Sequence, residues 1–202
     1  MDNAVGFPPK IVHSFVETLS STLGPDTLSA VIEKAGLPID WTETTHFTEL
    51  DDLQSSQAYG RLQTALRKYY GRGARSILLS IGCKLWNRLL KEAAFGIKAQ
   101  AAIVHGLPIG LRRKPALDLL ARQLSLKPGD ITIHTLDLDL LFVDHISPAA
   151  TGQSDSTPIC YVTLGMIREC LYWALGYEHD IEEISCRALG ARECEFKITA
   201  GG

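Results

Sequence analysis

The segment spanning residues 158–176 constrains the fold more than any other part of the chain. Within its sequence, PICYVTLGMIRECLYWALG, only Arg168 and Glu169 carry a charge. A helix that is apolar on nearly every face must be buried on nearly every face. The sequence therefore predicts a central core helix here, and the remaining elements must pack around it.

A β-hairpin is predicted immediately after this helix, in the sequence DIEEISCRALGARECEFKIT. Two extended runs flank a short turn at residues 189–192, where Gly190 supplies a permissive backbone. We expect the hairpin to pack beside the core helix.

Four of the five cysteines lie in this last quarter of the chain: Cys160, Cys170, Cys186 and Cys194. Cys186 and Cys194 lie on the two arms of the hairpin, so strand pairing brings them close together. With Cys160 and Glu183 they form a set of three thiols and one carboxylate, which suits a structural zinc ion. The spacing is not a common zinc-finger pattern, and free cysteines are usually small apolar core residues. Both interpretations stay open at this point.

The spacing of Glu183 and Cys186 sets a condition on any such site. Side chains three residues apart on a regular strand point to opposite faces of the sheet. A β-bulge, or a strand that begins only after Glu183, is therefore required if both side chains are to reach one ion.

The same segment contains Glu183-Ile-Ser-Cys186, then Gly190, then Cys194-Glu-Phe-Lys-Ile, preceded by Cys160, Gly165 and Gly176. This order resembles the C-terminal signature of the 4-vinyl reductase domain family. The sequence YGRGARSILLSIG, at residues 70–82, is also similar to an earlier helical segment of that family. The resemblance extends over residues 55–199.

The resemblance implies several properties. It implies a zinc ion held by Cys160, Glu183, Cys186 and Cys194, as in the ligand-binding domains of aromatic-responsive bacterial transcription activators. It also implies a fold related to haem–nitric-oxide-binding domains and to TRAPP subunits, in which long helices enclose an apolar ligand cavity against the sheet. A homodimer is expected on the same basis.

The order of elements predicts an α+β domain, with helices first and an antiparallel sheet after them. Apolar spacing and helix-ending residues predict helices at 9–23, 26–35, 53–70, 74–95, 99–105 and 111–124, and strands at 131–136 and 138–144. Residues 40–49 are polar and threonine-rich and are predicted as a connecting loop, and residues 147–157 are predicted as a flexible surface loop. The region around Asp137 forms either a tight turn or a kink within one long strand. We expect residues 1–52 to be a helical N-terminal extension and residues 53–202 to be the ligand-binding domain.

Charge and composition exclude several classes of function. The net charge of −3 gives no electrostatic case for a nucleic-acid partner. No apolar run is long enough to cross a membrane, and the N-terminal sequence does not have the pattern of a signal peptide. Five cysteines without an export signal favour a reducing, cytoplasmic location, with packing or metal-binding roles for the thiols.

Catalytic motifs are absent from the sequence. It contains no Gly-x-Ser-x-Gly, no His-Glu-x-x-His and no dinucleotide fingerprint. A reductase acting on a vinyl group needs a hydride donor, and no motif here is typical of a site that would hold one. We therefore assign no catalytic residue, and the sequence favours a protein that is not an enzyme.

A cavity that binds a small molecule is lined mainly by apolar and aromatic groups. The residues that we expect to line one are Trp86, Phe95, His105, His134, Phe142, Tyr161, Trp173 and Tyr177. Each aromatic residue could equally be ordinary core, and each histidine could be satisfied by a neighbouring carbonyl. Candidate ligands are an aromatic hydrocarbon, a lipid-like molecule or a tetrapyrrole.

Two other functions stay open. One is a 4-vinyl reductase, or an accessory that presents its substrate, in bacteriochlorophyll synthesis. The other is a protein–protein adaptor of the TRAPP type, which would require an exposed apolar helix face and a filled core.

Overall fold

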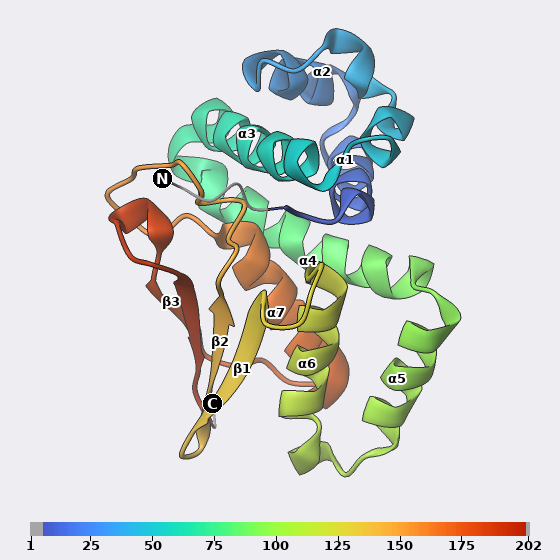
Figure 1. The fold of residues 1–202 in the computed structure, drawn as a ribbon, viewed down its shortest axis with the longest axis vertical. Coiled ribbons are helices and arrows are strands. Elements are labelled where there is room, and N and C mark those ends of the chain that lie inside the picture. Colours follow the sequence, from blue (N-terminus) through green and yellow to red (C-terminus); the bar gives the residue numbers. More distant parts are fainter. Residues whose placement is uncertain (1–5, 201–202) are drawn as a thin grey trace.

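The computed structural model describes residues 6–200 and has the mixed architecture of helices and antiparallel sheet that the sequence predicts (Figure 1). The α-helices are α1 (Pro9–Leu23), α2 (Pro25–Lys34), α3 (Asp52–Tyr70), α4 (Ala74–Glu92), α5 (Phe95–Gly106), α6 (Arg113–Leu124) and α7 (Tyr161–Leu175). The strands are β1 (Ile131–Leu136), β2 (Asp139–Asp144), β3 (Ile181–Ser185) and β4 (Cys194–Ile198). Short 3-10 helices connect them: η1 (Ile39–Thr42), η2 (Thr44–Thr48), η3 (Gly71–Gly73), η4 (Ile109–Leu111) and η5 (Arg187–Leu189).

The strands form one antiparallel sheet in the order β1-β2-β4-β3. Along β4, Cys194, Phe196 and Ile198 are buried while the residues between them are half-buried, as expected for a sheet with one face on the core. Helices α6 and α7 lie beside the sheet, and α1, α2 and α3 lie together beyond its upper end (Figure 1). The core thus lies between the sheet and these helices.

Helix α7 is the central core helix that the sequence predicts. Ten of its residues are buried, and the element that it contacts most extensively is α4. The two helices touch through their backbones at Gly82 and Gly165. A Cβ added at Gly165 would overlap the carbonyl oxygen of Leu79, and one added at Gly82 would overlap the carbonyl oxygen of Val162. No side chain fits between the helices at this point.

The turn between β1 and β2 decides between the two alternatives for Asp137. Leu136 pairs with Asp139, so the chain reverses within two residues. Asp137 has a φ of 54°, in the left-handed region that aspartate tolerates better than most residues.

Arg113, at the start of α6, donates to the carbonyl oxygens of Leu138 (3.0 Å) and Ile198 (3.3 Å). These two hydrogen bonds join α6 to the end of the sheet.

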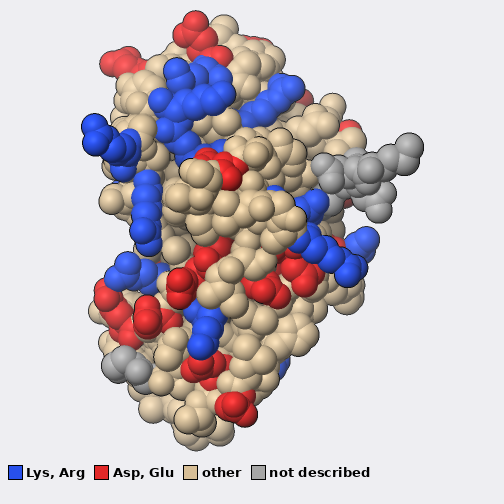
Figure 2. All heavy atoms as spheres, turned by 90° about the vertical axis from the view of Figure 1, so that its left-hand side faces the viewer, with Lys and Arg blue, Asp and Glu red and all other residues tan. Residues whose placement is uncertain are grey.

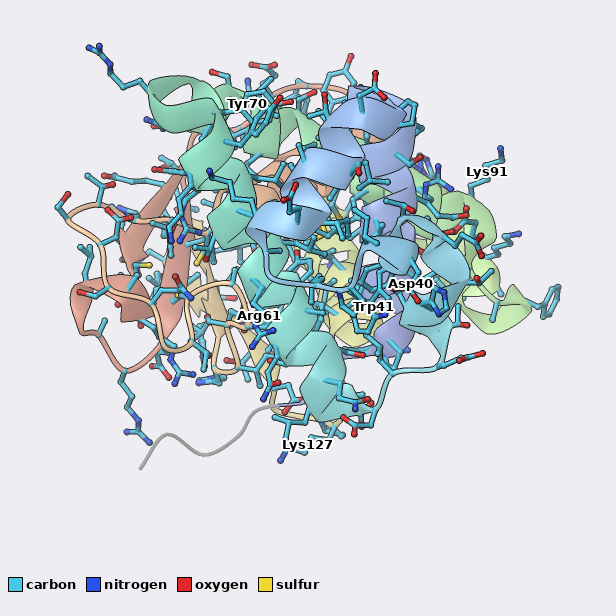
Figure 3. All side chains as sticks on the ribbon, turned by 90° about the horizontal axis from the view of Figure 1, so that it is seen from above. Asp40, Trp41, Arg61, Tyr70, Lys91 and Lys127 are labelled. Carbon is cyan, nitrogen blue, oxygen red and sulfur yellow. The ribbon has the colours of Figure 1, made fainter. Side chains whose placement is uncertain are left out.

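The prediction of a polar loop at residues 40–49 is wrong. This stretch forms η1 and η2, and Phe47 is fully buried. The ring of Trp41 meets that of Phe47 edge-on, with 5.1 Å between centroids. Figure 3 shows Asp40 and Trp41 on this short helical stretch, next to the N-terminal helices. The second part of the stretch, η2, packs against α1.

The prediction of a surface loop at residues 147–157 is wrong for its first part, because Ser147, Ala149 and Ala150 are buried. A carboxylate oxygen of Asp144 accepts from the backbone N–H of Ile146 (3.1 Å) and of Ser147 (2.7 Å), which fixes the turn after β2. The loop then packs so closely on α3 that a Cβ at Gly60 would lie 2.8 Å from the carbonyl oxygen of Pro148.

The helix predicted at residues 74–95 ends earlier, at Glu92, and α5 begins at Phe95. Residues of α1 and η2 belong to the same continuous core as α4 and α7.

Within residues 6–200, no helix combines the length and the apolar character needed to cross a membrane. Figure 2 shows that Lys and Arg side chains are interspersed with Asp and Glu on the face that carries β3.

Substituting Gly165 tests the contact between α4 and α7. Because the new methyl group would meet rigid backbone, Gly165→Ala should lower the free energy of unfolding by about 2 kcal/mol or more. The measurement is chemical denaturation followed by circular dichroism.

Gly96→Ala is the matched control, because nothing lies within 4 Å of a Cβ at Gly96 in α5. This control should leave stability unchanged or raise it by less than about 1 kcal/mol. Equal effects of the two substitutions would contradict the close helix contact.

Candidate metal centre

Four buried side chains from separate elements meet between the start of α7 and the β3–β4 hairpin. They belong to Cys160, at the N-cap of α7, to Glu183 on β3, to Cys186 directly after β3, and to Cys194, the first residue of β4. One ligand atom from each lies within 4.8 Å of those of the other three. The donors that the sequence singles out are thus brought together.

A β-bulge in β3 explains how Glu183 and Cys186 reach the same place. Glu183 pairs with Phe196, but Ser185 pairs with Glu195, so the register shifts by one residue at Ile184. The extra residue turns the side chain of Cys186 back to the face that carries Glu183, Phe196 and Cys194. The irregularity that the spacing required is therefore present.

The sulfur positions fit a tetrahedral ion. The Sγ–Sγ distances are 3.4 Å between Cys160 and Cys194, 4.0 Å between Cys160 and Cys186, and 3.9 Å between Cys186 and Cys194. Zn–S bonds of about 2.3 Å at tetrahedral angles would separate the sulfurs by about 3.8 Å. All five cysteines of the chain are free thiols.

Glu183 has one oxygen engaged and one that lacks a partner. Its Oε2 accepts from the backbone N–H of Cys160 at 3.0 Å, which joins β3 to α7. Its Oε1 is buried and has no hydrogen-bond partner among the described residues. Burial, together with the neighbouring Cys186, raises the pKa of the Glu183 carboxyl to about 8. A bound cation would give Oε1 a partner and would favour the ionised form.

Hydrogen bonds among the three thiols shift their pKa values. Hydrogen bonds from Cys160 and Cys194 lower the pKa of Cys186. Hydrogen bonds with the other two thiols, together with burial, raise the pKa of Cys160 well above its ordinary value. The backbone N–H of Arg187 also donates to the Sγ of Cys194 at 3.3 Å. A divalent ion that binds here must therefore displace protons, as thiolate ligation requires.

The residues expected to line a ligand cavity are not gathered into one chamber. Trp86 and Phe142 are fully buried core residues, and Tyr161 and Trp173 are half-buried against the same core. His105 meets Trp173 edge-on, with 4.5 Å between ring centroids.

Four of the eight residues lie on the surface: Phe95, His105, His134 and Tyr177. Phe95 is 87% exposed and Tyr177 is 44% exposed. His134 is exposed on β1, where its Nε2 forms a hydrogen bond of 2.9 Å with the hydroxyl of Thr132.

Four of the hollows formed by residues 6–200 are open to solvent. The predicted apolar chamber between sheet and helices is not among them. Gly82 and Gly165 draw α4 and α7 together, and the rings of Phe142 and Phe196, 5.9 Å apart, occupy the space beneath the sheet.

Sequence reasoning missed the residues of two adjoining hollows along α4 and α7, both of which include Leu79, Arg168 and Glu178. We call them together the α4–α7 groove. No spacing in the sequence marks this groove, because its lining comes from α4, α7 and the segment before β3.

Comparison with known families agrees with the C-terminal signature. Residues 143–200 match the family model of the V-4-R domain, the 4-vinyl reductase type, and this stretch contains all four candidate ligands. The match confirms the predicted family resemblance for this part of the chain. A search of curated proteins found no match.

Solved structures with similar folds confirm the predicted fold class. The phenol-responsive sensory domain of the transcription activator PoxR, with phenol, is 15% identical with a TM-score of 0.53, over 71% of this chain and 73% of that chain. A trafficking protein particle complex subunit 3 from Naegleria fowleri, covalently bound to palmitic acid, is 18% identical with a TM-score of 0.50, over 73% and 93%. An oxygen-binding H-NOX domain related to soluble guanylate cyclases is 14% identical with a TM-score of 0.50, over 95% and 93%. At these identities the likeness concerns the fold alone.

Thiol labelling tests the burial of the cluster. Of the five cysteines only Cys83 is half-buried, and burial raises its pKa. A thiol reagent such as DTNB should therefore react slowly with one thiol per chain in the folded protein and with five after unfolding. Cys83→Ser should abolish the reaction of the folded protein. Rapid labelling of two or more thiols before unfolding would contradict the buried cluster.

Proposed function

We propose that this chain, whose residues 143–200 match the V-4-R domain, is a small-molecule-binding domain in which a zinc ion fastens the β3–β4 hairpin to α7. The observation that carries the zinc proposal is the buried group of three Sγ atoms and one carboxylate, all within 4.8 Å. The fold neighbours support the ligand-binding proposal, since one contains phenol, one palmitic acid and one oxygen.

The zinc would be structural. Cys160, Glu183, Cys186 and Cys194 supply four protein ligands, which closes a tetrahedral site and leaves no position for a substrate. Two of these ligands flank the hairpin turn and one begins α7, so the ion would join elements that are distant in sequence. Binding would then contribute directly to the free energy of folding.

The ligand that we propose is a hydrophobic small molecule: an aromatic hydrocarbon, a lipid-like molecule or a tetrapyrrole. The supply of apolar side chains on α4 and α7 and the fold relationship support this class. We also propose a homodimer and a reducing, cytoplasmic location, in which the five free cysteines would stay reduced.

A second candidate function is that of a protein–protein adaptor. Its support is α5 and the loop that follows, where Phe95 is 87%, Ile103 64% and Leu111 63% exposed. Exposed apolar side chains of this kind are typical of protein interaction sites. The likeness to a trafficking complex subunit favours the same function.

Removal of a single ligand tests the zinc site. We expect about one zinc per folded chain by elemental analysis, and Cys186→Ala or Cys194→Ala should release it and lower the melting temperature. Glu183→Gln should weaken zinc binding at least tenfold in competition with a chelator, because a neutral amide replaces the carboxylate.

Cys170→Ala is the matched control for the zinc experiment. Cys170 is equally buried, but its thiol donates to the carbonyl oxygen of Ala116 at 3.2 Å and lies outside the cluster. This variant should keep its zinc. Stoichiometric zinc in both Cys186→Ala and Cys194→Ala would overturn the assignment.

Native mass spectrometry separates the two candidate functions. A ligand-binding domain should carry a small molecule of a few hundred daltons or take one up from a hydrophobic library. For the adaptor function, Phe95→Ser with Ile103→Ser should reduce association with itself or a partner while leaving zinc content unchanged. Association that survives this double substitution would exclude the α5 face as the interface.

A further inference from the structure

A second group of polar side chains lies on the solvent face of the sheet, opposite the thiol cluster. His134 is on β1, His145 directly follows β2, and Glu193 directly precedes β4. Along β1, Thr132 and His134 alternate with Ile133, which packs against the core, so these two polar side chains point to solvent. Strand pairing thus brings together four side chains that are far apart in the sequence.

Hydrogen bonds join these four side chains in a line. Nδ1 of His145 lies 2.6 Å from a carboxylate oxygen of Glu193. Nε2 of the same ring lies 3.0 Å from the hydroxyl oxygen of Thr132. Nε2 of His134 lies 2.9 Å from that same hydroxyl oxygen. Two imidazole nitrogens from different parts of the sheet therefore converge on one atom.

The carboxylate of Glu193 determines which nitrogen of a neutral His145 ring carries the proton. A carboxylate only accepts, so the hydrogen is on Nδ1, and the lone pair of Nε2 points towards Thr132. Histidines that bind metal ions almost always have this arrangement, in which the ring nitrogen that does not bind the metal donates to a carboxylate or a carbonyl. His145 and Glu193 therefore have the geometry of a metal ligand and the group that orients it.

These side chains are accessible to ions from solvent. His134 is exposed, and the side chains of His145 and Glu193 are 37% and 29% exposed. Exposed side chains change rotamer within nanoseconds, so both rings can turn their Nε2 atoms towards one ion. Because the rings lie in water, the proton on Nε2 of His134 can move to its Nδ1 through the solvent.

The surrounding charges favour a cation. Glu193 lies at the site, and Glu195 lies in line with Thr132 across β2, on the same face of the sheet. The guanidinium of Arg187 is also close, but it donates to backbone carbonyl oxygens, including that of His145 at 3.3 Å. Two carboxylates thus face the two imidazoles, and the one cation beside them is already hydrogen-bonded.

We propose that His134 and His145 bind one divalent transition-metal ion through their Nε2 atoms, with Glu193 orienting the ring of His145. Imidazole suits ions such as Ni²⁺, Cu²⁺ and Zn²⁺, whereas Mg²⁺ and Ca²⁺ take oxygen ligands. Water would complete the coordination. This site is distinct from the buried thiol cluster and does not depend on the zinc or the small molecule proposed above.

Ni²⁺ is the probe, added to the full chain without a polyhistidine tag. In isothermal titration calorimetry, Ni²⁺ should bind saturably with a Kd of about 100 μM or tighter. Mg²⁺ at the same concentrations should give no binding heat, because the site lacks the oxygen ligands that Mg²⁺ requires.

Substitutions of the two histidines and of Glu193 test the three roles. His134→Ala and His145→Ala should each weaken Ni²⁺ binding at least tenfold, because each removes one of the two protein ligands. Glu193→Ala should weaken it about tenfold, the loss typical for the partner of a ligating histidine. Glu193→Gln should lose less, because its amide oxygen can still accept from Nδ1 of His145.

His46→Ala is the matched control. His46 also lies beside a carboxylate, with 3.9 Å between its Nε2 and an oxygen of Asp40, but it belongs to η2 in the N-terminal helical part of the chain. This variant should bind Ni²⁺ as the parent does. Cys186→Ala should also keep its Ni²⁺ affinity, because the thiol cluster lies on the other face of the sheet.

Three results would overturn the two-histidine site: no saturable binding at about 1 mM Ni²⁺, unchanged affinity in both His134→Ala and His145→Ala, or loss of binding in Cys186→Ala. The last result would place the ion in the thiol cluster. Each of these results would leave the proposed zinc site standing, since that site is tested by the zinc content of the cysteine variants.

Discussion

The burial of α7 is the constraint on which the rest of the structure depends. A helix with so few charged positions is stable only when most of its surface is covered, and here α4, α6 and the sheet bury ten of its fifteen residues. The closest of these contacts is possible only because glycine occupies both Gly82 and Gly165. Backbone-to-backbone packing of this kind fixes the distance between α4 and α7, and the α4–α7 groove lies along the same two helices.

The group of three thiols and Glu183 complements that helix contact at the other end of the core. The backbone N–H of Cys160 binds the carboxylate of Glu183, while the three sulfurs lie at the spacing of tetrahedral ligands. Without an ion, one carboxylate oxygen is buried and unpaired among the described residues, which costs stability. A bound ion would join the N-terminus of α7 to the β3–β4 hairpin through their shared ligands.

Most of the fold could be predicted from the sequence, because its strongest signals are local. The charge-poor run of α7, the alternation in β4 and the proline and glycine at the ends of α1 each predict their element directly. Buried loops were harder: residues 40–49 and the start of the 147–157 segment look polar, yet Phe47 and Ala149 join the core. Such burial depends on which surface lies opposite, and the local sequence does not contain that information.

The candidate site also combines residues that could be predicted from the sequence with residues that could not. The four candidate ligands could be named because the sequence resembles a family in which these positions hold zinc, on the condition that a bulge brings Glu183 and Cys186 to one face, and the structure contains a bulge at Ile184. The ligand-lining set was harder to predict, because an aromatic side chain such as Trp86 or Phe95 occurs equally in a core, in a cavity wall or on a surface. His179 was not predicted as a lining residue, because nothing in the neighbouring sequence indicates that its ring lines a groove.

The bulge in β3 has a further effect, because β3 is an outer strand of the sheet. An outer strand with regular hydrogen-bonding groups can recruit a strand from another molecule, and an extra residue disturbs that template. The same irregularity that aligns Glu183 with Cys186 therefore discourages the addition of a strand from another copy along β3.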